Sequence, residues 1–585
     1  MYKKKLHFLN YLIILLFLLL TISLFNLQII NSSEYKLISE NNYVRIKTIL
    51  PVRGEIYDCK YRSIVTNKSS FNLYFSLGKI IDKNKVARFI SNNFDIEFSE
   101  VKEIIYRNRF RLYQDILLLQ NIEYKKFVEI SEQLNYFPSL SFQNESIRDY
   151  KYRNHFTGYV SKINEQEYGN LKDEGYSINS VIGKTGLEKF YEEQLIGRKG
   201  FEIIQVDATG KNLEFFKHNL ELSPQNGLNL ILSIDNELQN YISSIFPAKI
   251  NGAVVVIDVK TGGILAYISK PDFDQNIFLK NLIEKDWDNI INDPAKPMLD
   301  RIVHGTYPPA SVYKPVIASL GLEKEVIDEH TILSECEGGM QIGERFFKCW
   351  WEKGHGALSL LDAIKYSCDV YFYDLSMQLS LESIGDFTKQ NMLTVKTGID
   401  LPGERAGFFP TRKWYFENYG KFVGIVGPKV NISIGQGELL VTPLQVCSYF
   451  AAIANDGKWV KPHLVKKRIE KDKTNTISVE KKKLPVSEYN LNLIQTALYK
   501  TVNESYGTGI AAGVEGVTVY GKTGSAENHM GEETHAWFAG YAKWEEPEIA
   551  FVVFFENGGS GGGVAAPVAA TIVEFYDKMK NDLEE

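Results

Sequence analysis

The sequence predicts a mixed α/β (α+β) protein whose C-terminal domain has an antiparallel sheet of five strands flanked by helices. An elongated mixed domain would precede it, and one transmembrane helix would begin the chain. Three observations lead to this prediction: an apolar N-terminal stretch, strand-like runs at both ends of the region after residue 246, and helix-like runs between them. Strands that enclose helices in this order predict a single sandwich closed by the C-terminus.

Length and composition limit the classes of protein that fit. At 585 residues the chain exceeds a single ordinary core, so several domains are expected. A hydrophobic content of 44% and a charged content of 24% are typical of folded chains. The net charge of −6 gives no reason to expect a nucleic-acid partner, and five cysteines, an odd number, argue against a disulfide scaffold.

The N-terminus predicts a membrane anchor. Three lysines precede the stretch 6–33, which contains no Lys, Arg or acidic residue. A helix over residues 8–30 is long enough to cross a bilayer of about 30 Å. A cleaved signal peptide is the alternative, but no Ala-x-Ala site follows. The lysines predict that residues 1–7 remain in the cytoplasm and that everything after Asn31 lies outside it.

Residues 31–245 predict a mixed pedestal-like domain without a catalytic signature. We expect a strand and turn over 53–58, surface helices within 94–119, an amphipathic helix over 187–195 and a last strand over 230–235. The second domain would then cover residues 246–585.

The second domain begins with a hairpin signal. Two apolar runs, 252–258 and 263–268, surround the turn sequence Val259-Lys260-Thr261-Gly262. Three more strand-like runs follow far downstream at 516–522, 536–541 and 549–555, and a terminal helix is expected over 564–573. These five strands form the predicted sheet.

A candidate nucleophile lies at Ser311. Tyr307-Pro308-Pro309 predicts a rigid turn, and an apolar helix follows it. Ser311 and Lys314 are three residues apart, which places hydroxyl and amine on one helix face, so the lysine could take the serine proton. Ser-x-x-Lys occurs four more times in the chain, but only here does a proline turn precede it and an apolar helix follow.

Two further patterns contribute polar groups. Lys-Thr-Gly occurs four times, but only Lys522-Thr523-Gly524 ends an alternating strand, and the small Gly524 and Ser525 would let a substrate backbone lie against it. Ser367-Cys368-Asp369 lies between two helix-like runs. By itself, this second pattern also fits a helix N-cap formed by Ser or Asp.

Cysteine and histidine spacing indicates a second site. Cys336, Cys349, His355 and Cys368 are ligand types that zinc prefers, and they lie close together in sequence. The alternative is a disulfide between Cys336 and Cys349 with a buried Cys368. Composition alone leaves both interpretations open.

Taken together, Ser-x-x-Lys, Ser-x-Asp and Lys-Thr-Gly in this order resemble the motifs of penicillin-binding proteins and class A β-lactamases. Nearly the whole chain resembles the class B penicillin-binding proteins, and further matches are Arg53-Gly54-x-Ile56-x-Asp58, Gly183-Lys184-Thr185-Gly186-Leu187-Glu188, Gly398-Ile399-Asp400-Leu401-Pro402-Gly403-Glu404, Ile434-Gly435-Gln436-Gly437 and His535-Ala536-Trp537-Phe538. Departures are Ala310 where the family often has Gly, Asp369 where the division enzymes have Asn, and Asp58-Cys59-Lys60-Tyr61 in place of an Asp-Arg-Asn-Gly turn.

The resemblance implies a transpeptidase fold and a serine acyl-enzyme. Ser311 would attack the penultimate D-Ala carbonyl of a peptidoglycan stem pentapeptide, D-Ala would leave, and a neighbouring amine would complete the cross-link. Lys314 would be the base, which requires its pKa to fall by roughly 3 units. Ser367 would relay the proton toward the leaving amine, and Asp369 would fix the surroundings of Ser367. Lys522 and Thr523 would hold the terminal carboxylate of the substrate. The backbone N–H groups of Ser311 and Ser525 would form the oxyanion hole.

The resemblance also implies a metal and partners. Relatives that bind zinc in this region favour a structural Cys3His site, in which the metal would hold the second motif in place through Cys368. The chemistry itself would need no cofactor. Expected partners are β-lactams, the membrane, a RodA-type glycosyltransferase and MreC, with the catalytic domain periplasmic and anchored in the inner membrane.

Other functions share parts of this pattern. A β-lactamase or β-lactam sensor has the same three motifs, but no Glu-x-x-Leu-Asn deacylation motif is found, and a lactamase needs no large N-terminal domain. An inactive scaffold is disfavoured because the motif residues are intact. A bifunctional class A enzyme is disfavoured because residues 31–245 lack Glu-Asp-x-x-Phe. Elongation rather than division is expected from Asp369 and the Gly354-His355-Gly356 loop.

Overall fold

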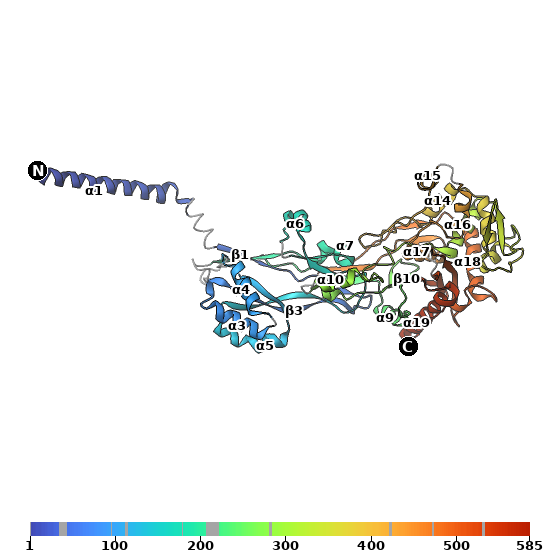
Figure 1. Ribbon diagram of the computed structural model, residues 1–585, viewed down its shortest axis with the longest axis horizontal. Helices are drawn as coiled ribbons and strands as arrows, with labels where there is room; N and C mark the ends of the chain where they lie inside the picture. The colour runs from blue at the N-terminus through green and yellow to red at the C-terminus, as the bar shows by residue number, and fades with distance from the viewer. Residues whose placement is uncertain are drawn as a thin grey trace. The chain divides into compact units, whose positions relative to one another are not determined.

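The computed structural model describes residues 2–33, 35, 44–94, 96–110, 115–177, 180–205, 222–279, 284–420, 424–470, 473–528 and 533–584. The chain forms two compact units, coloured along the sequence in Figure 1. Unit 1 comprises Met1–Arg53, Lys68–Ile147 and Ile196–Gly227, and unit 2 comprises Gly54–Asn67, Arg148–Leu195 and Leu228–Glu585. The sequence-based division after residue 245 stays a prediction, because each unit is assembled from several chain segments.

Unit 1 begins with one long apolar helix. Helix α1 (Tyr2–Phe25) continues into a π-helical turn over Asn26–Ile30, and none of its residues is buried. The 29 residues Tyr2–Ile30 have a mean hydropathy of 2.6 over their most apolar window. This length and composition fit a single-pass membrane anchor.

The rest of unit 1 is a small mixed module. Strands β1 (Val44–Ile49) and β8 (Gly200–Gln205) pair antiparallel. A separate core packs helices against strands, and its elements are α3 (Lys83–Asn93), α4 (Phe98–Arg107), the second half of β3 (Ser63–Ser76), β4 (Asp115–Ile122) and β5 (Leu140–Tyr150). Helix α5 (Tyr124–Ser131) lies between β4 and β5 in sequence. The surface helices expected within 94–119 are therefore only partly correct, since the stretch ends in β4.

The first part of unit 2 lies outside the main sheet. Strand β2 (Ile56–Tyr57) pairs parallel with β9 (Asn229–Leu232), which pairs antiparallel with β15 (Val465–Glu470). Further elements are β16 (Lys473–Thr476), β6 (Val160–Lys162), α6 (Glu165–Leu171), β7 (Val181–Gly183), α7 (Gly186–Phe190) and α8 (Glu192–Leu195). The Tyr191 hydroxyl donates to Asp400 at 3.0 Å, which ties this part to the C-terminal two thirds of the unit.

The main sheet of unit 2 has five antiparallel strands, as the sequence predicts. Their order is β11 (Ile264–Lys270), β10 (Gly252–Asp258), β20 (Pro547–Phe555), β19 (His535–Lys543) and β18 (Thr518–Ala526). The buried segments 252–258 and 549–555 occupy central positions, which explains their nearly continuous apolar sequence. The motif strand β18 lies at an edge of the sheet.

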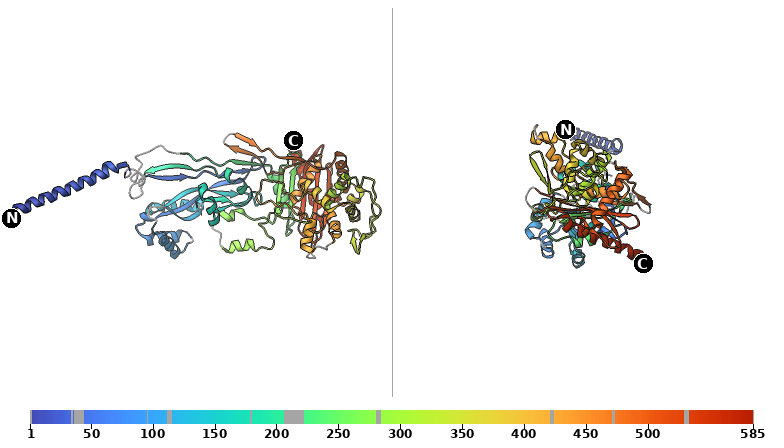
Figure 2. Two further views of the ribbon diagram at one scale, coloured as in Figure 1. Left: turned by 90° about the horizontal axis from the view of Figure 1, so that it is seen from above. Right: turned by 90° about the vertical axis from the view of Figure 1, so that its right-hand side faces the viewer.

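Helices cover both faces of this sheet. Val254 and Val256 pack with α9 (Asn236–Ile245) and α19 (Ala566–Glu584), whereas the alternate residues Ala253 and Val255 join the larger core with α17 (Pro443–Ala454). The end-on view in Figure 2 shows the yellow and orange helices on one side of the red strands and the C-terminal helix on the other.

The remaining helices and hairpins of unit 2 come from the middle of the chain. They are α10 (Glu284–Ile291), α11 (Lys314–Glu323), β12 (Gly339–Ile342), β13 (Arg345–Lys348), α12 (Leu360–Lys365), α13 (Asp369–Met377), α14 (Leu381–Gln390), α15 (Arg412–Tyr419), α16 (Val426–Ser433), β14 (Lys458–Val460), β17 (Lys481–Lys483) and α18 (Glu488–Asn503). Two places among them carry predicted site residues near β18: the segment before α11 and the α12–α13 junction. Helix α18 leads into the connection that continues to β18.

Candidate active site and metal-ligand cluster

The candidate nucleophile lies on a tight turn. Ser311 belongs to a 3₁₀ turn, Ala310–Tyr313, and Lys314 is the first residue of α11. In a 3₁₀ turn residues three apart lie on the same side, so Ser311 and Lys314 share a face as predicted. Ala310 has a φ of 52°, and its backbone N–H donates to Gly435 O at 2.8 Å. Ser311 is partly exposed, whereas Lys314 is completely buried.

Lys314 connects the first motif to the second. Its Nζ lies 2.7 Å from Ser367 O, 3.2 Å from Ser367 Oγ and 2.7 Å from Asp369 Oδ1. The buried ammonium therefore has three oxygen partners and lies near the Phe372 ring. The predicted pair of Ser311 with a lysine thus lies within a larger network, and the carboxylate partner is one that spacing alone did not indicate.

The second motif joins α12 to α13. Ser367 has a φ of 57°, and Cys368, which has no side-chain capping bond, precedes α13. The helix N-cap interpretation of this pattern is therefore wrong, since the Ser367 hydroxyl lies against Lys314 instead. Burial raises the pKa of the Asp369 carboxyl, while the Lys314 ammonium opposes this change. Asp369 also accepts the Trp350 N–H at 3.0 Å.

The third motif lies on β18 beside the nucleophile turn. A Cβ at Gly524 would lie 3.2 Å from both Pro309 O and a Val312 methyl, so glycine allows the strand to approach the turn closely. Lys522 is completely buried, and burial followed by the nearby Lys314 charge lowers its pKa well below the usual lysine value. Ser525, which follows Gly524 on β18, is exposed.

Contacts around β18 fix its end. Ser525 O accepts from the Gln436 side chain at 3.3 Å, and Ser525 Oγ accepts the Gly561 N–H at 3.1 Å. The Thr523 hydroxyl donates to the Thr508 hydroxyl at 2.9 Å. Sequence reasoning missed Thr508, and it gave Gln436 only as part of a family match, without its contact with β18. The sequence Gly507-Thr508-Gly509, a threonine between two glycines just before the motif strand, was a signal that could have found Thr508.

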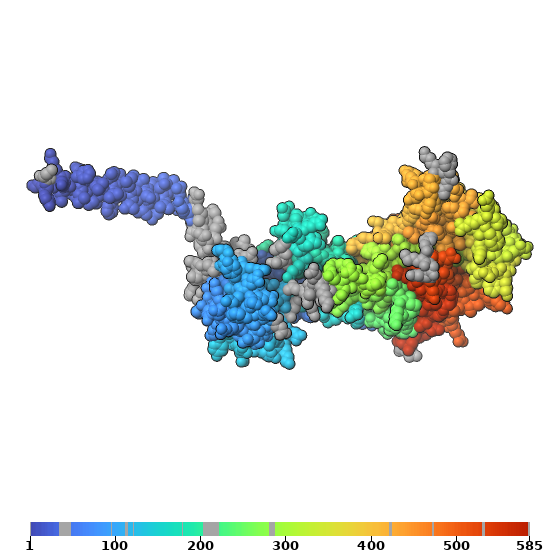
Figure 3. Space-filling view, viewed as in Figure 1, coloured from blue at the N-terminus to red at the C-terminus, as the bar shows by residue number. Residues whose placement is uncertain are grey.

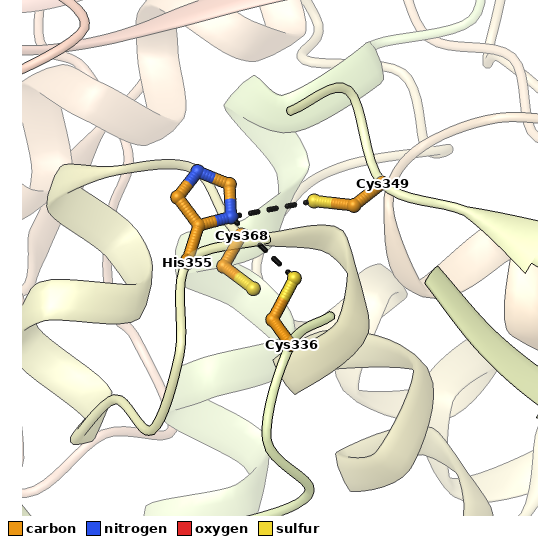
Figure 4. Close-up of side chains that lie close together, drawn as sticks. All are labelled: Cys336, Cys349, His355 and Cys368. Carbon is orange, nitrogen blue, oxygen red and sulfur yellow. Dashed lines mark hydrogen bonds between the residues drawn. The ribbon is translucent and has the colours of Figure 1, made fainter. Parts of the chain in front are cut away.

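The predicted metal ligands also meet in space. The ligand atoms of Cys336, Cys349, His355 and Cys368 lie within 4.8 Å of one another, and their side chains point toward a common centre (Figure 4). They come from the loops around the hairpin β12–β13 and from the α12–α13 junction. In the space-filling view, the yellow-green stretch that contains this hairpin lies on the surface of unit 2 (Figure 3).

The geometry of this cluster fits a metal ion with tetrahedral coordination. His355 Nδ1 lies 3.6 Å from Cys336 Sγ and 3.5 Å from Cys349 Sγ. Metal–ligand distances of about 2.3 Å for sulfur and 2.0–2.1 Å for nitrogen imply S···N separations of about 3.6 Å in a zinc tetrahedron. Cys336, Cys349 and Cys368 are free thiols, so no disulfide joins the first two. A hydrogen bond from Cys368 lowers the pKa of the Cys349 thiol.

Family comparisons cover most of the chain. Residues 252–574 match the penicillin binding protein transpeptidase domain, and residues 48–232 match the penicillin-binding protein dimerisation domain. The peptidoglycan D,D-transpeptidase MrdA of Haemophilus influenzae is 31% identical over 96% of this chain and 90% of its own length. The protein of the same name from Escherichia coli K12 is 30% identical over 94% of this chain and 90% of its own.

Solved structures of penicillin-binding proteins are also similar to most of this chain. A complex between the penicillin-binding protein PBP2 and MreC from Helicobacter pylori has a TM-score of 0.79 at 27% identity, covering 91% of this chain and 99% of the matched chain. Pseudomonas aeruginosa PBP2 in complex with WCK 5153 has a TM-score of 0.67 at 27% identity, covering 91% of this chain and 96% of the matched chain.

Proposed function

The chain belongs to the class B penicillin-binding proteins and is a serine-type peptidoglycan D,D-transpeptidase, and we propose that Ser311 is its nucleophile. The observation that carries this assignment is the convergence of three separated motifs on one site. Lys314 bonds to Ser367 and Asp369, and Gly524 of β18 lies against the turn that holds Ser311. Stem peptides of peptidoglycan are the substrate, and β-lactams acylate the same serine.

Acylation begins with removal of the Ser311 proton. Lys314 accepts this proton in its amine form, and the bond forms between Ser311 Oγ and the penultimate D-Ala carbonyl carbon. The 2.7 Å hydrogen bond from Lys314 Nζ to Asp369 is the shortest path by which Lys314 can pass on a proton and reach the amine form.

Collapse of the tetrahedral intermediate requires a proton on the leaving amine. Ser367 Oγ lies 3.2 Å from Lys314 Nζ, so it relays the proton from Lys314 to the nitrogen of the departing D-Ala. The C–N bond then breaks and the acyl-enzyme remains. The same groups act in reverse when an amine of a second stem peptide attacks and Ser311 regains its proton.

The substrate is held by groups on β18. Lys522 and Thr523 hold the terminal carboxylate of the donor peptide, and the backbone N–H groups of Ser311 and Ser525 stabilise the oxyanion. Gly524 leaves room for the peptide backbone to lie along the strand. This arrangement explains why the site recognises a peptide that ends in a free D-amino acid.

Labelling with fluorescent penicillin tests the nucleophile. The detergent-solubilised wild type is expected to form a covalent adduct, and Ser311→Ala is expected to form none, with the adduct located on Ser311 by mass spectrometry. Thr571→Ala, on the exposed face of α19, is the control and should label like the wild type. An adduct on another side chain, or none in the folded wild type, would overturn the assignment.

A β-lactamase is the second candidate because it shares the three motifs. The two activities differ in the fate of the acyl-enzyme. A transpeptidase stays acylated by penicillin, whereas a lactamase turns over many equivalents. We expect one equivalent of penicillin to be consumed per chain over several minutes, and hydrolysis of many equivalents would favour the lactamase.

We further propose that the Cys336–Cys349–His355–Cys368 cluster holds one structural zinc ion. The donor set and the 3.5–3.6 Å sulfur–nitrogen separations support it. Bound zinc would neutralise thiolates and fix Cys368, which lies between Ser367 and Asp369. Elemental analysis of chain purified without chelator should give about one zinc per chain, and Cys336→Ser should lower that content and the melting temperature. Absence of zinc from the folded chain would end this proposal.

We also propose the cellular setting. The enzyme acts in cell elongation with its α1 tail in the cytoplasm and its catalytic unit outside, and its partners are MreC and a RodA-type glycosyltransferase. The likeness to a PBP2–MreC complex supports the first partner, and a likeness to a peptidoglycan synthase complex, with a TM-score of 0.72 at 25% identity, supports the second. Protease treatment of intact spheroplasts should digest the catalytic unit, and protection of that unit would reverse the orientation.

A further inference from the structure

Thr508 lies between the second and third motifs although it belongs to neither. Its backbone N–H donates to Lys365 O at 3.3 Å, and its hydroxyl donates to the same oxygen at 3.4 Å. Lys365 ends α12, two residues before Ser367. The Lys365 ammonium pairs with Glu504 at 2.8 Å, and Glu504 follows α18 on the same connection as Thr508. Three contacts therefore hold this connection against α12.

The hydroxyls form a chain with a defined direction. Since Thr508 Oγ1 donates to a carbonyl, its lone pair accepts the Thr523 proton at 2.9 Å. In this structure the Thr523 hydroxyl therefore donates its only proton to Thr508. In its proposed role the same hydroxyl must donate to a substrate carboxylate. The 3.4 Å bond to Lys365 O is long for a hydroxyl, so little is lost when it opens.

The chain can reverse without leaving a buried group unpaired. If Thr508 turns its proton to Thr523, the Thr523 proton becomes available to a carboxylate oxygen. Lys365 O keeps the Thr508 N–H as its donor at 3.3 Å. A hydroxyl that accepts one hydrogen bond becomes a stronger donor of the next, so Thr508 would strengthen the Thr523 contact.

We propose that Thr508 is a positioning residue for the substrate's terminal carboxylate, acting through Thr523. In the free enzyme the hydroxyl chain runs from Thr523 to Thr508 to Lys365 O, and in the complex it runs from Thr508 to Thr523 to the carboxylate. Only proton positions within hydrogen bonds change, and no group gains or loses charge. The inference rests on the proposed role of Thr523 as a carboxylate-binding residue.

The test compares a ligand that has the carboxylate with one that lacks it. Benzylpenicillin and its C3 methyl ester acylate by the same ring opening, but the ester cannot accept as an anion. In the detergent-solubilised full chain, Thr508→Val should slow acylation by benzylpenicillin roughly 3- to 10-fold, the worth of one ordinary hydrogen bond. Acylation by the ester should not change, and Thr508→Ser should restore the benzylpenicillin rate.

Further variants separate positioning from structure. Thr496→Val, on the exposed face of α18, is the matched control and should react like the wild type with both ligands. In a Thr523→Val background, adding Thr508→Val should cause no further loss. Thr508→Ala is a second variant without the hydroxyl if the valine variant does not fold.

Three outcomes would overturn the inference: an equal slowing with both ligands, no slowing with either, or additive losses in the double variant. The first would assign Thr508 a purely structural role. If the wild type itself is not acylated on Ser311, the proposed function fails before this test applies. Normal wild-type acylation with an unaffected Thr508→Val would remove the inference alone.

Discussion

Single residues of the active site hold backbone conformations that side chains usually avoid. Ala310 and Ser367 both have left-handed φ angles. Ala310 immediately precedes the first motif, and Ser367 is the first residue of the second. Such conformations cost about 1–3 kcal/mol each, so surrounding contacts must hold them. The Ala310 N–H bond to Gly435 O and the Ser367 contacts with Lys314 are those contacts. The strain therefore lies beside Ser311 and at Ser367, the two residues whose hydroxyls we propose to be catalytic.

The buried Lys522 gives a pH-dependent prediction. Its folded-state pKa is lowered by burial, so between that value and about 10.4 the unfolded chain binds more protons than the folded chain. Stability contributed by this group therefore increases with pH, by about 1.4 kcal/mol per pH unit within that window. Lys522→Met should stabilise the chain most at low pH, and the gain should shrink as the pH rises toward 10.

Thermal melts of wild type and Lys522→Met over pH 6–10 measure this difference. Lys543→Met, at the partly exposed end of the neighbouring strand β19, is the control for replacing a lysine by methionine in the same sheet. A stabilisation by Lys522→Met that grows with pH would contradict the assigned direction of the pKa shift.

The ion pair between Lys314 and Asp369 gives a second prediction at this scale. Asp369→Asn would keep an acceptor for the Trp350 N–H but leave the fully buried Lys314 without its carboxylate. Removing one partner of a buried pair costs about 3–5 kcal/mol. Asp362→Asn, which removes the partner of Lys500 in a more exposed pair at 3.8 Å, should cost less than about 1 kcal/mol. Denaturant titration of both variants measures the contrast, and equal costs would refute it.

The sequence suggested candidate site residues, but it did not indicate how they contact one another. Ser311, Lys314, Ser367 and Lys522 could be chosen because motif order and local turns are visible in the chain. The contact of Thr508 with Thr523 could not, because it joins residues on opposite sides of a turn whose geometry depends on α12 and α18. Short-range spacing indicates which residues share a helix face, but only tertiary packing determines which hydroxyl meets which.

At the scale of elements, one loop contacts both the turn that holds Ser311 and strand β18. Gly435 O accepts from Ala310 on the nucleophile turn, and Gln436 donates to Ser525 O on β18. Gly435 has a φ of 74°, and a Cβ there would lie 2.1 Å from Ala310 O. No side chain can occupy that space unless the turn moves. The loop therefore sets the distance between the proposed nucleophile Ser311 and strand β18.

Gly435→Ala tests this function of the loop. The variant should lose at least 10-fold in penicillin acylation and melt at a lower temperature, because both the φ angle and the contact are unfavourable. Gly169→Ala in α6 is the matched control, since a Cβ there meets nothing within 4 Å and the helix favours alanine. Wild-type acylation by Gly435→Ala would show that the loop does not set this distance.

The elements themselves differed in how well the sequence predicted them. The five strands of the main sheet were predicted because central strands such as β10 and β20 are apolar on both faces, and hairpin turns mark their ends. In unit 1, β4 lies where surface helices were expected. Its partner β3 is far away in sequence. The mixed composition of β4 fits a half-exposed helix or strand equally well, so only its pairing with β3 determines that it is a strand.

At the scale of the whole molecule, unit 2 depends on segments that precede residue 246. Ile56, Leu187 and Leu230 are completely buried in the same core as the catalytic helices. Leu238 and Ile242 of α9 cover the opposite face of the main sheet. Strand β15 loses its partner β9 if the earlier segments are removed, which exposes an unpaired strand edge. The catalytic fold is therefore not confined to the residues that carry the motifs.

A truncation series tests this dependence. A chain beginning at residue 44 retains every segment of unit 2 and should be a folded protein that penicillin acylates at the full-length rate. A chain beginning at residue 246 loses β2, β9, α9 and the Tyr191–Asp400 bond, so it should aggregate or remain unlabelled. Size-exclusion chromatography and fluorescent penicillin labelling measure both properties. A monomeric, fully labelled 246–585 chain would show that the motif-bearing region folds by itself and that its stability does not depend on the earlier segments.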